Sequence, residues 1–368
     1  MVLGDLKPDY VDLISAMGGQ VIDVGRSKIN PLDAGGALEH AHLLPPEPRA
    51  RLLSAAHERT LTMVASLIHI IRGAVPSDRE VTILDRALRT LEASISGRQP
   101  TLEDLLHAIR NPSEQVRLAA LDRGEWTRYQ TITEDLEASL QALLGGKFGD
   151  VFAGETTVPM KMDRAVVFDV SALSDSEKDL QAAVLLACWS YGFASVEAAQ
   201  TLADAGVAQR HRHFIIMDEL WRILRASSGI VDRIDGLTRL NRTIGVGQAM
   251  ITHTMQDLEA LASAEDVAKA KGFVERSKIV AMGGLPHAEM DLVADVVRMS
   301  EAEKRLITSW QDPPSWDSTT GVVTAPPGRG MLLLKVGGRP GIPVRIELTD
   351  VERALNDTNK RWQVGQVE

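Results

Sequence analysis

The sequence predicts an α/β protein whose mostly parallel sheet, flanked by helices, is interrupted by an all-helical subdomain. Short apolar runs of strand length alternate with helical patterns at the beginning of the chain and again after residue 164. Between residues 35 and 150, apolar residues recur at helical spacing without clear strand patterns. This order of patterns is typical of a helical subdomain inserted into one α/β core.

At 368 residues, 44% hydrophobic and 24% charged, the chain has the composition of a soluble globular protein. Its net charge of -10 argues against indiscriminate nucleic-acid binding by the whole surface. Cys188 is the only cysteine, which excludes an internal disulfide and fits a reducing cytosol. The longest uncharged run, Gln181–Val196, is shorter than the ~20 residues of a membrane span. We therefore expect a core helix there, and membrane association only through partners.

Residues 1–34 are predicted to begin the core. Val2–Gly4 is the stub of a strand, and Asp9–Ala16 is an amphipathic helix that stops at Gly18-Gly19. Gln20–Val24 is a second short strand, followed by a turn at Asn30–Asp33. Two short strands joined by a helix form a βαβ unit, which implies a parallel sheet.

Residues 35–150 are the predicted helical subdomain. Turn signals at Pro45-Pro46, Gly97–Pro100 and Asn111-Pro112 divide it into several helices. The helical spacing is clearest over Leu61–Ile71, Ile83–Leu91 and Leu136–Leu144.

Residues 151–350 are predicted to complete the core, and residues 351–368 to form a short helix and a polar tail. After a Pro/Gly-rich loop, Met331–Val336 and Pro343–Leu348 form an expected antiparallel pair that closes the sheet. Further strands are expected over Ala165–Val170, Phe214–Met217, Gln248–Thr252 and Lys278–Met282. Helices are expected over Ser176–Ala199, Ile230–Ile244, Gln256–Ala262, Glu265–Glu275, Glu289–Val297 and Glu301–Ser309.

Polar or acidic side chains follow the ends of four predicted strands. Because the carboxyl ends of parallel strands meet at one edge of an open sheet, where ligands bind, we expect these residues to form a site. Solvated loop acids would look the same one at a time, but four strand ends together favour a shared site. The residues are Asp5, Asp169, Asp218 with Glu219, and Thr252 with His253.

The strand Phe214–Met217 is the most informative of these, because it ends directly in Asp218 and Glu219. Nucleotide hydrolases with a phosphate-binding loop build their metal and water site in this way. The first acid reaches Mg²⁺ through water, and the second polarises the attacking water. The alternative is structural: Asp218 would be an N-cap and Glu219 a first-turn acid that faces the helix dipole.

Other familiar site patterns are missing from the sequence. The nine histidines have no metal-ligand spacing, and there is no Gly-x-Ser-x-Gly elbow. A nucleotide hydrolase should carry a Gly-x-x-x-x-Gly-Lys-Ser/Thr loop before its acidic strand, and the 368 residues contain none. Gly145–Phe148 comes nearest, but no Ser or Thr follows its lysine, and it ends a helical segment.

The order and spacing of the remaining motifs resemble the VirB/TraC-type ATPases of conjugative type IV secretion systems, in the HerA/FtsK superfamily of RecA-like P-loop NTPases. Val2–Tyr10 is similar to the family's second strand, an aliphatic run followed by Asp-Pro-x-x-Glu-Tyr. Gly18-Gly19 and Asn30–Asp33 resemble its Gly-Gly and Asn-Pro-Phe/Leu-Asp signature. A helical subdomain follows, and Gly146–Thr156 with Val166–Ser171 resemble the return to the core.

Met217–Trp221 is similar to the family's Walker B sequence, commonly Asp-Glu-Ala-Trp. Ile251–Thr254 stands where the family has Ala-Thr-Gln-Ser, so that His253 replaces the usual sensor-like glutamine. The resemblance covers nearly the whole chain, and it begins just after the family's phosphate-binding loop.

The resemblance implies a cytoplasmic, hexameric motor, peripheral to the cell membrane through partners. It would couple hydrolysis of ATP, with Mg²⁺, to assembly of a secretion channel or transfer of DNA or protein. Glu219, Thr252 and His253 would be catalytic, and Asp218 would hold Mg²⁺ through water. Asp5 and Asp169 would lie beside the cofactor. A neighbouring subunit would supply an arginine to the γ-phosphate, and the candidates are Arg239, Arg242, Arg276 and Arg329.

Without a phosphate-binding loop, we expect this chain to be either the C-terminal portion of a longer ATPase or a remnant that does not hydrolyse ATP alone. The main alternative is a non-catalytic assembly module derived from such an ATPase. A Mg²⁺-dependent nuclease that uses Asp169, Asp218 and Glu219 is less well supported, because no catalytic lysine follows at short spacing on a strand.

Overall fold

A computed structural model describes residues 1–35, 40–174, 176–226, 231, 234, 245–261, 263–315 and 325–355. Its internal contacts divide the chain into two compact units, Met1–Ile251 and Thr252–Glu368. The predicted helix over Ile230–Ile244 falls almost wholly outside the described residues.

The N-terminal unit contains a five-stranded parallel sheet in the order β2-β3-β1-β4-β5, which confirms the predicted parallel sheet. β3 lies between β1 and β2, although β1 and β2 follow each other along the chain. The strands are β1 (Val2–Asp5), β2 (Gln20–Asp23), β3 (Val166–Asp169), β4 (Phe214–Met217) and β5 (Gly247–Met250), and helices α1 (Val11–Ala16) and α10 (Leu220–Ala226) follow β1 and β4.

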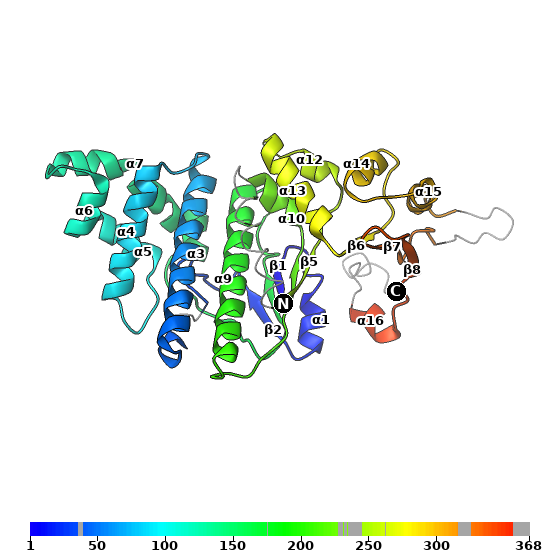
Figure 1. Cartoon of the computed structure of the whole chain (residues 1–368), viewed down its shortest axis with the longest axis horizontal. Coiled ribbons are helices and arrows are strands. Elements are labelled where there is room, and N and C mark those ends of the chain that lie inside the picture. The colour runs from blue at the N-terminus through cyan, green and yellow to red at the C-terminus, as the bar shows by residue number, and fades with distance from the viewer. Residues whose placement is uncertain are drawn as a thin grey trace, which may run out of the picture. The chain divides into compact units, whose positions relative to one another are not determined.

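β1 is the central strand of this sheet, and all of its residues are buried. The long helix α9 (Lys178–Asp204) packs closely against it, as Figure 1 shows. A Cβ at Gly192 would lie 2.5 Å from the Leu3 side chain, so the approach of helix and strand requires glycine. Trp189 strengthens the contact, because its indole N–H donates to the Leu3 carbonyl.

Among the described residues, α9 is the one helix long and apolar enough to cross a membrane. However, 83% of its most apolar window is buried inside the protein. This burial is the pattern of a core helix, as the sequence predicts. Cys188 lies within it, and burial raises the pKa of its thiol, so the thiolate that would react is disfavoured.

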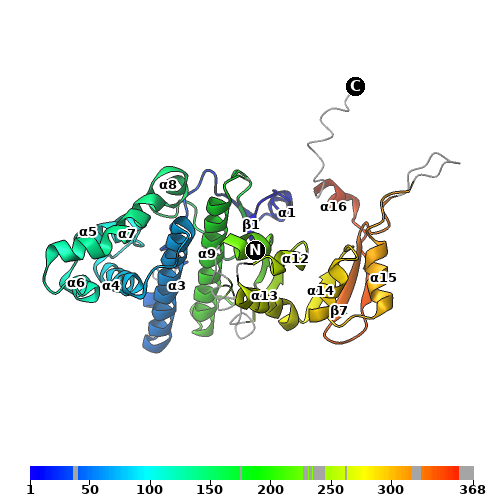
Figure 2. The ribbon, with the colours of Figure 1, turned by 90° about the horizontal axis from the view of Figure 1, so that it is seen from above.

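The helices between residues 46 and 152 form the predicted all-helical subdomain, seen in Figures 1 and 2 as the group α3 to α8 beside α9. Capping boxes begin two of them, with Ser77 and Glu80 at α4 and Thr101 and Asp104 at α5. The elements are η1 (Ala41–Leu43), α3 (Pro46–Arg72), α4 (Asp78–Ser94), α5 (Leu102–Arg110), α6 (Glu114–Ala120), α7 (Trp126–Leu144) and α8 (Gly146–Phe152).

A buried histidine joins α3 to α4. His57, 3% exposed, contacts Glu92 through Nδ1 at 2.9 Å and Asp85 through Nε2 at 2.8 Å. Because both ring nitrogens face carboxylates, the imidazolium form can donate to both at once. The hydrogen bond to Glu92 raises the pKa of His57 against the opposing effect of burial.

The C-terminal unit contains a three-stranded antiparallel sheet in the order β6-β7-β8. The predicted antiparallel pair is present, but it does not close the parallel sheet, because β7 pairs with β6 in a sheet of its own. The elements are α12 (Gln256–Glu259), α13 (Ala264–Arg276), β6 (Ile279–Met282), α14 (Glu289–Val296), α15 (Glu301–Ser309), β7 (Met331–Val336), β8 (Ile342–Arg345) and α16 (Asp350–Leu355).

Glu303 on α15 fastens that helix to the β7–β8 hairpin. Its Oε1 accepts from Lys335 Nζ at 2.9 Å and from the Gly341 N–H at 2.5 Å, and its Oε2 accepts from the Ser300 N–H at 2.7 Å. Burial alone would raise the pKa of Glu303, but these donors together lower it to about 2. Lys335 is 3% exposed, and Glu303 forms an ion pair with it.

We predict that the protein loses stability as pH rises through the raised pKa of His57. The pKa of His57 is higher in the folded than in the unfolded state. The stabilisation by the protonated ring is therefore complete below about pH 6.5, and it is lost as pH rises above the folded-state pKa. In urea titrations followed by circular dichroism, the wild-type midpoint should fall with rising pH, while His57→Gln should give a flatter profile. Parallel profiles for the two proteins would contradict this assignment.

Replacement of Glu303 by glutamine should destabilise the C-terminal unit by about 3 kcal/mol, because the Lys335 ammonium would stay buried without an anion. In the wild-type protein, the stabilisation by the ionised Glu303 carboxylate is present above pH 4.5 and is lost as pH falls toward about 2. Native-state hydrogen exchange at β7 would measure the change. Glu301→Gln, at a side chain that is 76% exposed, is the control, and an equal effect of both substitutions would disprove the prediction.

Candidate active site

Four adjacent strands of the parallel sheet end in, or just before, an aspartate. Asp23 ends β2, Asp169 ends β3, Asp5 ends β1, and Asp218 directly follows β4. The order β2-β3-β1-β4 places these residues at one edge, and Asp169 is a register partner of both Asp5 and Asp23. Glu219 comes next in the chain and is 7% exposed. Acidic side chains therefore line this edge of the sheet, with Asp5 and Asp169 on its two inner strands.

Asp5 holds the turn between β1 and α1. It is 2% exposed, and its two carboxylate oxygens accept from the Asp9 N–H at 3.1 Å and the Tyr10 N–H at 2.8 Å. Burial raises the pKa of Asp5, and these two amides oppose that shift. On the neighbouring strand, Asp169 Oδ1 accepts from the Ser171 N–H at 3.0 Å. The contacts seen here are structural, and the predicted contact of these acids with a cofactor stays a prediction.

Tyr10 orients Asp218. Its hydroxyl donates to Asp218 Oδ2 at 3.2 Å, and the Glu219 N–H donates to Asp218 Oδ1 at 2.8 Å. Burial raises the pKa of Tyr10, and the charge of Asp218 raises it further, so the phenol stays protonated and keeps donating. The Asp218 carboxylate is thereby fixed between one side chain and one amide.

Glu219 has a strained backbone and an oriented side chain. Its φ is +52°, in the left-handed region that costs an L-residue roughly 1–2 kcal/mol. The indole N–H of Trp221 donates to Glu219 Oε2 at 2.6 Å. Non-glycine residues in this conformation persist where the surroundings enforce them, and such residues are common at functional sites.

Cations surround Glu219. Arg222 Nε lies 3.5 Å from Glu219 Oε2, and Lys7 Nζ lies 3.9 Å from Oε1. Arg222 and Arg225 each lie 5.1 Å from the centre of the Trp221 ring, so the indole that donates to Glu219 also makes two cation–π contacts.

The oxygens of this edge suit Mg²⁺ that is bound mainly by other ligands. Mg²⁺ is usually held in proteins through one or two carboxylates, together with phosphate oxygens and waters. Within the ranges that the structure describes, no three His, Cys, Asp or Glu side chains form a complete metal site. Asp218 accepts one hydrogen bond at each oxygen, which leaves lone pairs for a water of the ion's shell. The donor set fits the water-mediated contact predicted from the sequence.

Four of the other predicted site residues belong to the C-terminal unit, and two lie outside the described residues. Thr252 and His253 come just after β5, at the start of the C-terminal unit. Arg276, which ends α13, and Arg329, in the turn before β7, also belong to that unit. Arg239 and Arg242 lie outside the described residues. The roles proposed for these six residues stay predictions.

Sequence reasoning missed Tyr10, Trp221 and Lys7 as parts of the site. Tyr10 and Trp221 belong to the motifs Val2–Tyr10 and Met217–Trp221, and this membership was the one sequence signal that could have identified them. Spacing alone could not show which carboxylate each one reaches, because Tyr10 lies 208 residues from Asp218 along the chain.

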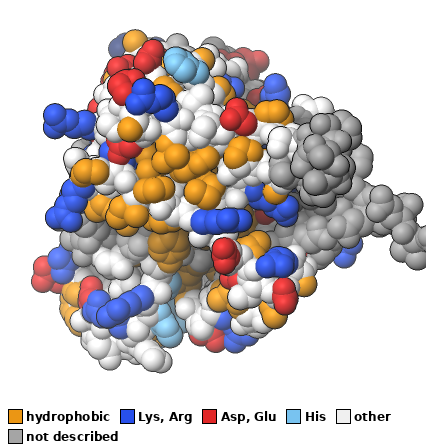
Figure 3. Space-filling model, turned by 90° about the vertical axis from the view of Figure 1, so that its right-hand side faces the viewer, with side chains coloured by type: hydrophobic (Ala, Val, Ile, Leu, Met, Phe, Trp, Pro, Cys, Tyr) orange, Lys and Arg blue, Asp and Glu red, His pale blue; other side chains and the backbone are white. Residues whose placement is uncertain are grey.

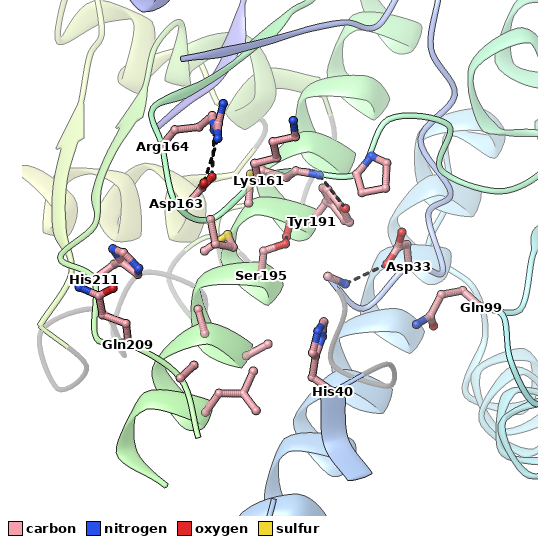
Figure 4. A pocket seen from close by; sticks show the side chains of 18 residues that line it. Asp33, His40, Gln99, Lys161, Asp163, Arg164, Tyr191, Ser195, Gln209 and His211 are labelled. Atoms are coloured by element: carbon pink, nitrogen blue, oxygen red, sulfur yellow. Dashed lines mark hydrogen bonds and ion pairs between the residues drawn. The ribbon is translucent and has the colours of Figure 1, made fainter. Parts of the chain in front are cut away.

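A pocket of about 650 Å³ lies at the other end of these strands (Figure 4). Its walls come from residues 159–164 before β3, residues 208–211 before β4 and one side of α9, including Tyr191 and Ser195. It opens near the amino ends of the strands, whereas the acidic residues lie at the carboxyl ends. None of the predicted site residues lines it, so we do not assign the active site there.

No model of a known protein family matches the sequence, and no curated protein matches it. Among solved structures, VirB4 of Thermoanaerobacter pseudethanolicus matches with a TM-score of 0.67 and 17% sequence identity, over 95% of this chain and 82% of that chain. The chain has the VirB4 fold. A bacterial conjugative coupling protein, TrwBdeltaN70, matches at a TM-score of 0.45 and 10% identity, over 78% of this chain and 68% of that chain, which is too low to define a shared fold.

The VirB4 fold confirms the predicted class: a mostly parallel sheet flanked by helices, with a helical subdomain and C-terminal antiparallel strands. At the level of the fold alone, the likeness to VirB4 agrees with the family resemblance that the motifs indicate.

We predict that Glu219→Gly is more stable than Glu219→Ala by about 1 kcal/mol. Both variants lose the carboxylate and its contacts with Trp221 and Lys7. The difference in their stability therefore measures the cost of the left-handed backbone conformation at residue 219. Glycine adopts φ +52° without strain, whereas alanine keeps the penalty of a Cβ. Urea unfolding of the two variants measures the difference. Equal stability, or a more stable alanine variant, would show that residue 219 is not held in this conformation.

Proposed function

We propose that this chain supplies the acidic part of the ATPase site in a type IV secretion or conjugation motor. The observation that carries the proposal is the pair Asp218 and Glu219 at the end of β4, oriented by Tyr10 and Trp221 within a VirB4 fold. Asp218 would hold Mg²⁺ through water, and Glu219 would accept a proton from the attacking water. ATP and Mg²⁺ are the cofactors that this site would use.

The surrounding residues suit these two roles. Tyr10 and the Glu219 N–H each donate to one oxygen of Asp218, which restricts the direction in which the carboxylate meets a cation's water shell. Trp221 fixes the Glu219 carboxylate, so little conformational freedom remains to be lost in the reaction. Lys7 and Arg222 lie within 4 Å of the Glu219 carboxylate and add to the contacts that hold it in place.

ATP binding also needs a phosphate-binding loop, which the 368 residues do not contain. If the loop supplies four charge-assisted hydrogen bonds at ~1.5 kcal/mol each, its absence costs ~6 kcal/mol. This is about four decades of affinity. We therefore propose that the loop comes from a polypeptide segment outside these residues and that this chain is inactive without it.

The remaining parts of the proposal follow from the family that the motifs resemble. With the loop supplied, the protein would form a homo-oligomeric ring, expected to be a hexamer. Thr252 and His253 would sense the nucleotide, and an arginine of a neighbouring subunit would reach the γ-phosphate. The motor would act in the cytoplasm on secretion machinery at the inner face of the membrane, with DNA or protein as its cargo.

A non-catalytic assembly module is the second candidate. It is favoured by one observation, the missing Gly-x-x-x-x-Gly-Lys-Ser/Thr sequence, since a scaffold needs the fold but no nucleotide. The two candidates differ in whether any reconstituted form of this chain hydrolyses ATP through Glu219.

We predict that the isolated 368-residue chain shows no ATP hydrolysis above a no-enzyme control, because the phosphates lack their main ligands. A phosphate-release assay at millimolar ATP and Mg²⁺ measures this. Turnover by the chain alone that disappears in Glu219→Gln would contradict the prediction and show that the site is self-sufficient. The Glu219→Gln variant preserves the side-chain volume, so it also controls for trace contaminating ATPases.

A further inference from the structure

The corner between α6 and α7 has a strained backbone. Among the described residues other than glycine, only Leu121, Arg123 and Glu219 have a positive φ, and the first two lie in this corner, at +57° and +56°. The left-handed conformation is unfavourable for residues with a Cβ, so glycine is the usual residue that adopts it at the end of a helix. Instead, α6 ends at Leu121. The corner therefore keeps a leucine at a position that suits glycine.

The same corner exposes apolar side chains. Leu118, Leu121 and Trp126 are 66%, 61% and 46% exposed, and we call these three residues the corner patch. Hydrophobic side chains also gather over the middle of the surface that Figure 3 shows. Within the described part of the chain, however, Leu121 is the one apolar residue that is both exposed and left-handed in its backbone. Neither burial nor relief of strain explains this leucine within one molecule, and strained residues of this kind are common at functional sites.

Polar contacts hold the corner in one shape. Asp122 is 5% exposed, and it accepts from the Gly124 N–H at 2.9 Å and from Arg117 Nε at 2.6 Å. The Arg117 guanidinium lies 5.8 Å from the centre of the Trp126 ring, which stacks on Tyr129 with 5.5 Å between the ring centres. Trp126 is thus fixed although it is exposed. A fixed aromatic side chain loses little freedom on binding, which is typical of the central residues of protein interfaces.

The charges around the corner patch are balanced. Glu114, Arg123, Glu125 and Arg128 are exposed, and we call them the rim charges. None of the four belongs to an ion pair among the described residues. Two carboxylates and two guanidinium groups give the rim no net charge, so it does not favour a partner of one strong sign such as a nucleic acid. A second copy of the same surface fits it, because a two-fold contact can place each carboxylate opposite an arginine.

The corner lies where another molecule can reach it. α6 packs on α4 and α7. Figures 1 and 2 both show α6 at the end of the helical subdomain that is away from α9. A contact at this end uses none of the strands that carry the acidic residues of the candidate active site.

We infer that the α6–α7 corner is a contact surface for a second copy of this chain, related to the first by a two-fold axis. The two corner patches meet at the centre, and the rim charges of one copy pair with those of the other. Because the apolar centre consists of three side chains, the dimer is weak and reversible, as is usual for small interfaces. The contact goes beyond the proposed function: it needs no nucleotide, and a two-fold contact closes on two copies instead of building a ring.

Sedimentation velocity of the full chain over a range of concentrations measures the dimer. Leu118→Glu, which charges the centre of the contact, and Leu121→Gly, which removes an apolar side chain but suits the backbone, should each weaken dimerisation at least about tenfold. Val207→Glu is the matched control, because Val207 is 40% exposed in the turn after α9 and lies outside the corner. Circular dichroism checks that each variant is folded. A wild-type chain that stays monomeric at millimolar concentration, or equal dimerisation of Leu121→Gly and the control, would overturn the inference.

Two charge-reversal variants test the two-fold arrangement. One carries Arg123→Glu with Arg128→Glu, and the other carries Glu114→Arg with Glu125→Arg. Each should fail to dimerise alone, because like charges then face each other across the axis. An equimolar mixture of the two should restore the dimer, because opposite charges meet again, and this recovery also shows that both variants are folded. A mixture that stays monomeric while the wild-type chain dimerises would show that the copies meet elsewhere and would overturn the inference.

Discussion

The close packing of α9 on β1 is the constraint on which the N-terminal unit depends. Gly192 lets the helix backbone approach Leu3, and Trp189 bonds to the same strand. Because β1 lies between β3 and β4, this contact sets the position of the three strand ends that carry Asp5, Asp169 and Asp218. A larger residue at Gly192 would displace β1 and, through it, the acidic edge. The positions of the acidic side chains at the site therefore depend on packing in the core.

The donors that orient Asp218 are neutral. The Tyr10 hydroxyl and the Glu219 N–H hold its two oxygens, and they fix its geometry without cancelling its charge. An arginine bonded bidentately to Asp218 would hold it as firmly but would compete with a metal ion for the same charge. The charge of Asp218 therefore remains available to a cation. Burial raises the pKa of the nearby Asp9, and the negative charge of Asp218 raises it further.

Much of the fold could be predicted because it depends on local patterns. The apolar run Phe214–Met217 and the helix Glu301–Ser309 have the predicted ends, and the acidic residues lie where strand ends require. Contacts between distant segments could not be predicted. Neither the place of β3 between β1 and β2 nor the pairing of β6 with β7 follows from periodicity, which contains no information on strand order. The donors to Asp218 and Glu219, and the left-handed backbone of Glu219, were missed for the same reason.

The backbone of Glu219 also bears on selection. Glycine is one nucleotide change away from glutamate, and at φ +52° that change would remove strain worth about 1 kcal/mol. Stability gains of this size are readily accessible to proteins through single substitutions. The protein thus carries the Glu219 carboxylate at a backbone position where glycine would be free of strain.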